Sequence, residues 1–210
     1  MDTLKFGTVS APDGKRGPWR ISTLTPTEED VLLMNLRYVR DGKAYLCCPP
    51  GTYRRLTHET RGVIMSNTPM EINTAQAAIR DARGNVFVSG LGLGMVVEAM
   101  LRKPEVLSVV VAELDHNVMS LVGPTVSRIA AEHGKPLVVN RCDVEAYTPA
   151  ADERFDYAWH DIWDQIDDDN LPQMARIMDK FRPFTKQQAC WSRPQALALK
   201  REMNRITYIG

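Results

Sequence analysis

The stretch Val86–Gly94 reads VFVSGLGLG and determines how the rest of the chain is interpreted. Its first half is a short β-branched and aromatic run, typical of a buried strand. Its second half places Gly90, Gly92 and Gly94 at alternate positions. Glycine adopts positive φ at little steric cost and lets the backbone approach a ligand where a Cβ would collide. The stretch therefore predicts a strand followed by a tight turn that faces a ligand.

A second feature lies nineteen residues after the last of these glycines. Glu113 follows another apolar run, Leu107–Ala112. In dinucleotide sites an acid about twenty residues beyond the glycine turn accepts hydrogen bonds from ribose hydroxyls. Taken alone, the three glycines would also fit a turn that binds no ligand. Together with Glu113 they favour an adenosine-bearing cofactor at the carboxyl ends of two parallel strands.

Downstream of residue 68, apolar patterns alternate between strand and helix, which is typical of a parallel α/β sheet. The chain predicts a Rossmann-like, doubly wound, mostly parallel sheet over residues 68–210, as a cofactor-binding domain. The predicted strands are 86–89, 107–112, 137–140, 155–160 and 187–191. The predicted helices are 70–83, 93–103, 115–133 with an interruption at Gly123-Pro124, 170–181 and 194–206.

Residues 1–67 form the predicted N-terminal part. Residues 1–25 are rich in Gly, Pro, Lys and Arg and are interpreted as an irregular or mobile lead-in. Thr25-Pro26 followed by acids predicts the start of a helix that runs to Arg40. The short runs 44–48 and 62–66 predict a small β-hairpin that leans on the main domain.

Composition narrows the class of protein. The 210 residues carry 26 Lys+Arg and 26 Asp+Glu, so no bulk attraction to nucleic acid is expected, although a local basic patch stays open. The four cysteines form no CxxC pair, so no metal site is predicted, and a reduced, cytoplasmic setting is expected. No apolar run is long enough to span a membrane, and the N-terminus lacks a signal-peptide core.

The glycine turn does not fit a dinucleotide fingerprint. In G-x-G-x-x-G the third glycine would stand at Met95 or Val97, and no phosphate-binding G-x-x-x-x-G-K-[ST] loop is present. What remains is G-x-G-x-G, and with Glu113 it resembles the class I S-adenosylmethionine-dependent methyltransferases. The resemblance implies S-adenosyl-L-methionine as the cofactor.

Three further blocks are similar to the spermidine-synthase-like branch of that family. Val88 is apolar where most methyltransferases have an acid, and Ala112–Asp115 reads AELD. Asn140–Val144 and Phe155–Asp164 look like the family's adenine-reading block and its block at the end of the fourth strand. The resemblance covers residues 60–192. The cofactor-binding residues that it implies are Gly90, Leu91, Gly92, Gly94, Glu113, Leu114, Asp143, Val144 and Asp161.

Asp161 is the predicted catalytic residue. The resemblance implies that it helps to take a proton from the attacking group, which a carboxylate can do if burial raises its pKa toward neutrality. A local capping role is the structural alternative. Weaker candidates are Asp164, Glu71 and Asn67, and either pocket walls or core packing would explain Trp159, Trp163 and Trp191.

The predicted sheet has two strands fewer than a complete class I methyltransferase sheet. Their loss would remove residues that shape the acceptor pocket and would expose a strand edge, so a homodimer is expected. The leading hypothesis is a methyltransferase with an unidentified acceptor. The alternatives are aminopropyl transfer to a polyamine, which the missing tyrosine-histidine-glutamate run disfavours, and a non-catalytic subunit that binds S-adenosylmethionine.

Overall fold

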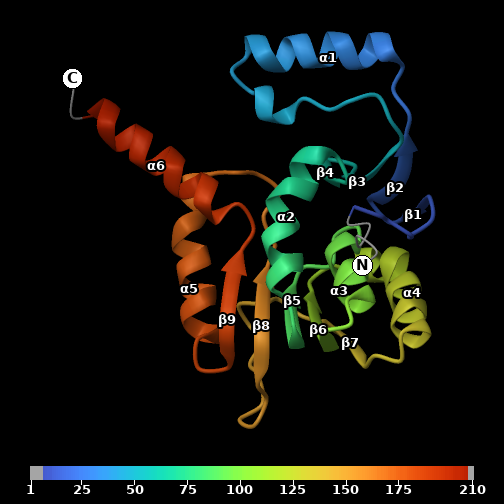
Figure 1. Ribbon diagram of the computed structural model, residues 1–210, viewed down its shortest axis with the longest axis vertical. Coiled ribbons are helices and arrows are strands. Elements are labelled where there is room, and N and C mark those ends of the chain that lie inside the picture. Colours follow the sequence, from blue (N-terminus) through green and yellow to red (C-terminus); the bar gives the residue numbers. More distant parts are fainter. Residues whose placement is uncertain (1–6, 208–210) are drawn as a thin grey trace.

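The computed structural model describes residues 7–207 and contains a five-stranded parallel sheet (Figure 1). Its strand order is β7-β6-β5-β8-β9, so the chain builds outward from β5 in one direction and then crosses to the other side. Both neighbours of β5 run parallel to it. The predicted fold class is confirmed. The strands are β5 (Gly84–Ser89), β6 (Val106–Glu113), β7 (Leu137–Arg141), β8 (Phe155–His160) and β9 (Thr185–Cys190).

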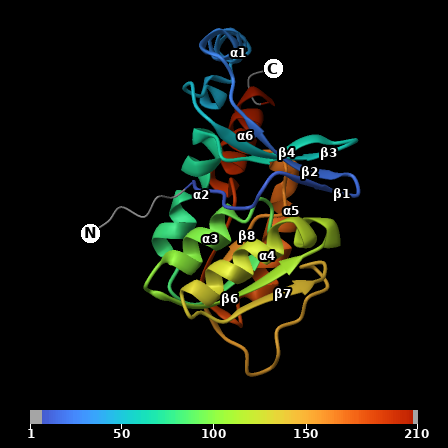
Figure 2. The ribbon, with the colours of Figure 1, turned by 90° about the vertical axis from the view of Figure 1, so that its right-hand side faces the viewer.

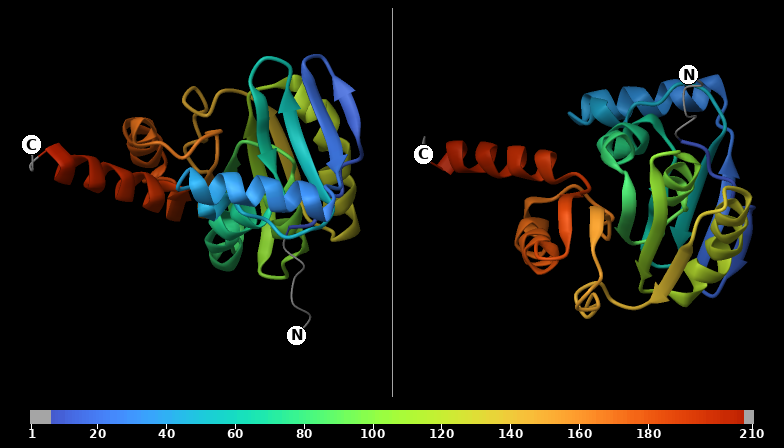
Figure 3. Two further views of the ribbon diagram at one scale, coloured as in Figure 1. Left: turned by 90° about the horizontal axis from the view of Figure 1, so that it is seen from above. Right: turned by 60° about the horizontal axis from the view of Figure 1, so that its bottom comes forward.

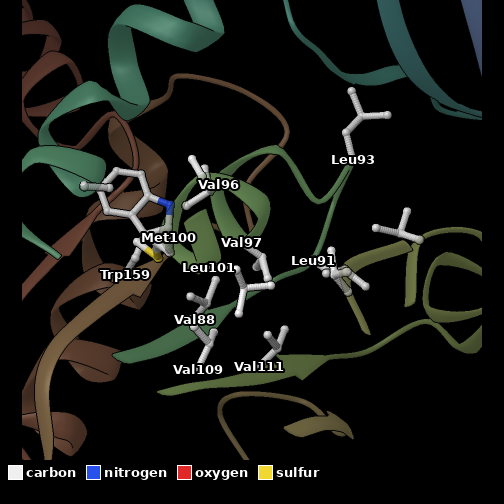
Figure 4. Close-up of a cluster of buried hydrophobic side chains, with 14 of the residues drawn as sticks. Val88, Leu91, Leu93, Val96, Val97, Met100, Leu101, Val109, Val111 and Trp159 are labelled. Atoms are coloured by element: carbon white, nitrogen blue, oxygen red, sulfur yellow. The ribbon is translucent and has the colours of Figure 1, made fainter. Parts of the chain in front are cut away.

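Helices cover both faces of this sheet. Alternate residues of β5 point to opposite faces, so Val86 and Val88 join one buried cluster and Phe87 joins another. Figure 4 shows Val88, Val109 and Val111 of the sheet facing the apolar side of α3. The covering helices are α2 (Pro69–Asp81), α3 (Met95–Arg102) and α4 (His116–Glu132), and α5 (Leu171–Phe181) packs on the second face.

Helix α4 corrects one expectation. The predicted interruption at Gly123-Pro124 is wrong, because α4 continues through both residues. A proline inside a helix removes a single backbone donor, and apolar packing of the flanking turns compensates for that loss. Val118, Val122, Val126 and Ile129 are all buried against the sheet.

The N-terminal part is a four-stranded antiparallel sheet, larger than the predicted hairpin. Residues 14–24 are not irregular: Trp19 and Ile21 point inward, whereas Arg20 is exposed, which is the alternation of a half-buried strand. The predicted strand at 44–48 is also wrong, since residues 44–46 form a short 3-10 turn, η1 (Ala44–Leu46). The strands are β1 (Gly14–Arg16), β2 (Trp19–Leu24), β3 (Tyr53–His58) and β4 (Gly62–Ser66).

Two helices lie at the periphery of the molecule. Helix α1 (Glu28–Arg40) begins later than predicted, because Thr27 and Asp30 form a reciprocal capping box. After η2 (Asp168–Asn170), α5 and β9, the chain ends in α6 (Arg193–Thr207), which extends away from the sheet (Figure 3). No helix within residues 7–207 is both long and apolar enough to cross a membrane.

The N-terminal sheet lies over the carboxyl ends of the parallel strands. It packs beside α4, and Figure 2 shows β1–β4 above α3 and α4. In open α/β sheets a ligand binds outside these strand ends, where the strand order reverses. The reversal here falls between β5 and β8. The second sheet therefore closes the place where the fold offers a site.

Candidate active site

The glycine turn after β5 has the geometry that its sequence predicts. Gly90, Gly92 and Gly94 have φ values of +87°, +51° and +76°. A Cβ on Gly90 would overlap the backbone carbonyl oxygen of Asp161, so the ends of β5 and β8 can approach only because this side chain is absent. A Cβ on Gly92 would lie 2.6 Å from the Met65 sulfur of the N-terminal sheet. The turn is thus tight on both sides.

Glu113 fixes the turn from the neighbouring strand. Its Oε2 accepts the Leu91 backbone N–H at 2.8 Å, and its Oε1 accepts the Asp115 N–H at 2.8 Å. The side chain is buried, and burial raises the pKa of this carboxyl above its usual value. A carboxylate has about four lone-pair positions, so each oxygen retains capacity for one further donor. Two adjacent hydroxyls match that capacity.

A cavity of about 390 Å³ opens at these strand ends, a size typical of small-molecule sites. Eight of the nine predicted cofactor-binding residues line it, and together they come from all of the strand ends except β9. Gly94 does not line it. This glycine caps the start of α3, where a Cβ would lie 2.6 Å from Val122, so its role is to pack α3 against α4. The eight are Gly90, Leu91, Gly92, Glu113, Leu114, Asp143, Val144 and Asp161.

Asp161 shares the cavity with a second carboxyl, that of Glu71 in the first turn of α2. Burial raises the pKa of Asp161 to about 7. Burial, and then the negative charge of Asp161, raise the pKa of Glu71 to about 8. Like charges at close range disfavour double ionisation. The two carboxyls therefore lose their protons less readily than exposed acids do.

Tryptophans form the wall beside these acids. Trp159, Trp163 and Trp191 all line the cavity, and Trp159 and Trp191 are also buried in the core, so both interpretations of these two residues hold. The indole N–H of Trp191 donates to the Thr74 hydroxyl at 2.9 Å, and that of Trp163 donates to the Gln173 side chain at 2.8 Å. The buried Trp159 N–H finds no hydrogen-bond partner among the described residues. A weaker interaction of this N–H with the Asp161 carboxyl partly offsets the rise in the pKa of that carboxyl.

A buried hydrogen bond joins the two strand ends that carry Gly90 and Asp161. The Ser89 hydroxyl lies 2.7 Å from His160 Nδ1, and His160 Nε2 lies 3.2 Å from Gln188 Oε1. Gln188 donates its amide to the Met178 carbonyl, so its oxygen faces the imidazole. His160 then donates from Nε2 and accepts at Nδ1, and burial lowers its pKa to about 4. His160 supports the site from beneath and does not line the cavity.

The N-terminal sheet supplies a wall that motif reasoning did not predict. Trp19 of β2 donates its indole N–H to Asp115 at 2.7 Å, and the Arg61 guanidinium lies 4.9 Å from the Trp19 ring. Met65 accepts the Leu93 backbone N–H at 3.4 Å and so lies on the glycine turn. The alternation of apolar and polar residues over 19–23 was the sequence feature that could have predicted this strand. The lining residues from this sheet and its β3–β4 turn are Trp19, Leu56, Arg61, Ile64 and Met65.

Asn67 and Asp164, two of the weaker candidates, have different outcomes. Asn67 accepts the Arg54 backbone N–H at 2.6 Å and donates to the Gly7 carbonyl at 2.9 Å, so it ties the N-terminal segments together. It does not line the cavity. Asp164 lies at the cavity and is exposed. The structure thus makes Asn67 a scaffold residue and Asp164 an exposed acid at the cavity.

The acid pair predicts how stability depends on pH. A carboxyl whose pKa is higher in the folded than in the unfolded chain contributes stability below its unfolded pKa and loses it as pH rises through the folded pKa. For Glu71 and Asp161 that window runs from about pH 4 to about pH 8. The free energy of unfolding should fall across it, by at most about 1.4 kcal/mol per pH unit for each group.

Urea denaturation at a series of pH values measures this slope. Asp161→Asn and Glu71→Gln should each flatten the decline, because neither amide ionises. The matched control is Asp169→Asn, which changes an exposed acid of η2 away from the cavity. A control slope equal to those of the two site variants would contradict the assignment.

No protein-family model matches the chain, and no curated protein sequence matches it. Part of the fold is similar to solved structures. A dimethyladenosine transferase from Plasmodium falciparum is 18% identical over 59% of this chain and 41% of its own, with a TM-score of 0.43. A putative methyltransferase from Bacillus halodurans is 22% identical over 54% of this chain and 47% of its own, with a TM-score of 0.39.

An S-adenosylmethionine-dependent methyltransferase from Clostridium acetobutylicum is 11% identical, with a TM-score of 0.35. The match covers 55% of this chain and 43% of that one. The matched regions thus span less than half the length of each of these three chains.

Proposed function

We propose that this chain is an S-adenosylmethionine-dependent methyltransferase of class I, in its spermidine-synthase-like branch. The observation that carries the proposal is Glu113, whose Oε2 anchors the glycine turn at the Leu91 N–H while the side chain lines the cavity. An acid in this position is suited to the paired hydroxyls of a ribose. Dinucleotides are disfavoured, since the third glycine of their fingerprint is replaced by Met95 or Val97.

The residues around the cavity fit the parts of that cofactor. Glu113 would accept from the ribose, and Leu114 and Val144 would pack on the adenine ring. Asp143 Oδ1 already accepts the Glu145 backbone N–H at 2.8 Å, which leaves Oδ2 for the adenine amino group. The Gly90–Gly92 backbone would run beside the methionyl part. When bound, the cofactor supplies an activated methyl group on a sulfonium.

Asp161 is the proposed proton acceptor. Its carboxyl lies at the end of β8, beside the glycine turn, and its pKa near 7 is matched to catalysis at neutral pH. Glu71, with a pKa near 8, is the proposed second carrier. In this scheme Glu71 keeps its proton and Asp161 is ionised. The acceptor's proton then moves to Asp161 as the acceptor attacks. The Trp159 N–H, which partly lowers the Asp161 pKa, would orient that carboxylate.

Aminopropyl transfer to a polyamine is the second candidate function. Six acids line the cavity, among them Glu71, Asp161 and Asp164, and Arg61 is the only cationic side chain among the described lining residues. This balance favours a cationic acceptor. The proposed methyl transfer and this alternative differ in which form of the cofactor the site accepts.

Isothermal calorimetry tests the cofactor. The full chain is titrated with S-adenosylmethionine, S-adenosylhomocysteine and decarboxylated S-adenosylmethionine. We expect binding of the first two. A marked preference for the decarboxylated form would instead support aminopropyl transfer as the function. Binding without turnover on any acceptor class would support a non-catalytic subunit, and no binding of any of the three would refute the cofactor.

Asp161→Asn tests the proton acceptor. Loss of a general base lowers turnover by about 100-fold or more, whereas S-adenosylhomocysteine affinity should stay within about threefold. S-adenosylhomocysteine formation is measured by mass spectrometry with panels of small amines, alcohols and carboxylic acids. Asp169→Asn, at an exposed residue of η2, is the matched control. Turnover that is equal in both variants would remove Asp161 from the mechanism.

A further inference from the structure

Helix α1 packs on the molecule with one side only. Val31 is buried, and Asn35 binds the segment after η1 through two hydrogen bonds. The Asn35 Nδ2 donates to the Cys48 carbonyl at 2.9 Å, and its Oδ1 accepts the Cys48 backbone N–H at 3.1 Å. Figure 1 shows α1 at the far end of the molecule from the parallel sheet. Its inner side is therefore anchored, and its outer side faces solvent.

The outer side of α1 is apolar. Leu32, Leu33, Leu36 and Val39 are between 51% and 59% exposed. Leu32, Leu36 and Val39 follow the i, i+4, i+7 spacing of one helical face, and Leu33 flanks them. Single exposed leucines are ordinary, but a contiguous apolar stripe on a short helix marks an interaction surface. We call these four residues the α1 stripe.

Charge is segregated along the same helix. Glu28, Glu29 and Asp30 lie in the first turn, and Arg37 and Arg40 lie near the last. Arg40 also contacts the adjacent Asp41 at 2.9 Å, but both side chains are exposed, so this pair contributes little. The surface thus has an apolar centre with an acidic end and a basic end. Such a surface is complementary to itself when it is turned through 180°.

We propose that the α1 stripe pairs with the α1 stripe of a second copy of this chain, with the two helices antiparallel. A two-fold axis near residue 34 brings Leu32 of each copy opposite Leu36 of the other. The same operation brings Glu28 opposite Arg40 of the other copy, and Glu29 opposite Val39, beside that arginine. A two-fold interface uses one patch twice, which is what this self-complementary pattern supplies. A parallel arrangement would instead place like charges together.

The size of the surface sets the strength of the pairing. Thirteen residues make a helix about 20 Å long. Such a contact is smaller than a standard stable interface, so the dimer forms in a concentration-dependent way. Sedimentation velocity of the full chain should show a mass that rises from 23.7 kDa toward twice that value as concentration increases. A monomer at every concentration would overturn the proposal.

Leu32→Glu/Leu36→Glu tests the stripe. Both residues are exposed, so the variant should fold, with an unchanged circular dichroism spectrum, and should remain monomeric. Leu107→Glu/Leu199→Glu is the matched control, because it adds the same two charges at exposed leucines of β6 and α6. This control should dimerise as the parent does. If the stripe variant dimerises equally well, the interface lies elsewhere and the proposal fails.

Charge reversal tests the antiparallel orientation. Glu28→Lys/Glu29→Lys should weaken dimerisation by about tenfold, because each basic end then meets a basic partner. Adding Arg37→Glu/Arg40→Glu to the same chain should restore it, since opposite charges face each other again. In a parallel pair the first change would have no effect, and that result would refute the orientation.

Discussion

Gly90→Ala should lower the free energy of unfolding by about 3 kcal/mol and abolish measurable binding of S-adenosylhomocysteine. The new methyl group would overlap the Asp161 carbonyl oxygen, a backbone atom that cannot rotate away. In addition, φ at this position is +87°, where an alanine is strained. The ends of β5 and β8 would have to separate, which moves Asp161 relative to the glycine turn. Urea denaturation and calorimetry give the two quantities.

Gly134→Ala is the matched control for this prediction. Its φ is +63°, but no heavy atom of the described chain lies within 4 Å of the position of its Cβ. It should therefore show only the backbone cost, about 1 kcal/mol, and bind as the parent does. The difference between the two variants isolates the steric contact with Asp161. Equal losses of stability would mean that the backbone shifts easily to avoid the contact with Asp161. The glycine turn would then not be rigid.

The parallel sheet could be predicted from sequence because its signals are local. The VFVSGLGLG stretch contains its own strand, its own turn and the start of its own helix within nine residues. Glu113 was found because the βαβ unit has a nearly constant length, so spacing alone places the acid next to the turn. Asp161 likewise follows a strand end. Each of these residues needed only a short piece of chain to be interpreted.

The other half of the cavity depends on contacts between distant segments. Strand β2 pairs with β3 across an insertion that holds α1, and the register brings Trp19 opposite His58. No local pattern tells which face of this sheet meets the glycine turn. Glu71 was a weak candidate for the same reason, because its proximity to Asp161 arises only when α2 packs beside β5 and β8. The Gly- and Pro-rich composition of residues 1–25 obscured the alternation of β2.

Glu113→Ala should weaken S-adenosylhomocysteine binding by about 100-fold, or about 2.7 kcal/mol. Two effects combine. The ribose would lose its carboxylate acceptor, and the Leu91 and Asp115 backbone N–H groups would lose their buried partner, which loosens the turn. The second effect should also lower the free energy of unfolding by about 1–3 kcal/mol. Calorimetry well below the unfolding temperature separates affinity from stability.

Glu98→Ala supplies the control that separates the two effects. Glu98 is also a buried glutamate, but its partners are Ser10 and Arg102, and it does not line the cavity. It should cost a similar amount of stability and leave affinity unchanged. Glu113→Gln refines the result, because an amide has one acceptor oxygen where the carboxylate uses two. Its affinity should fall between those of the parent and Glu113→Ala. If Glu113→Ala loses stability but binds like Glu98→Ala, Glu113 only holds the turn, and the ribose role is wrong.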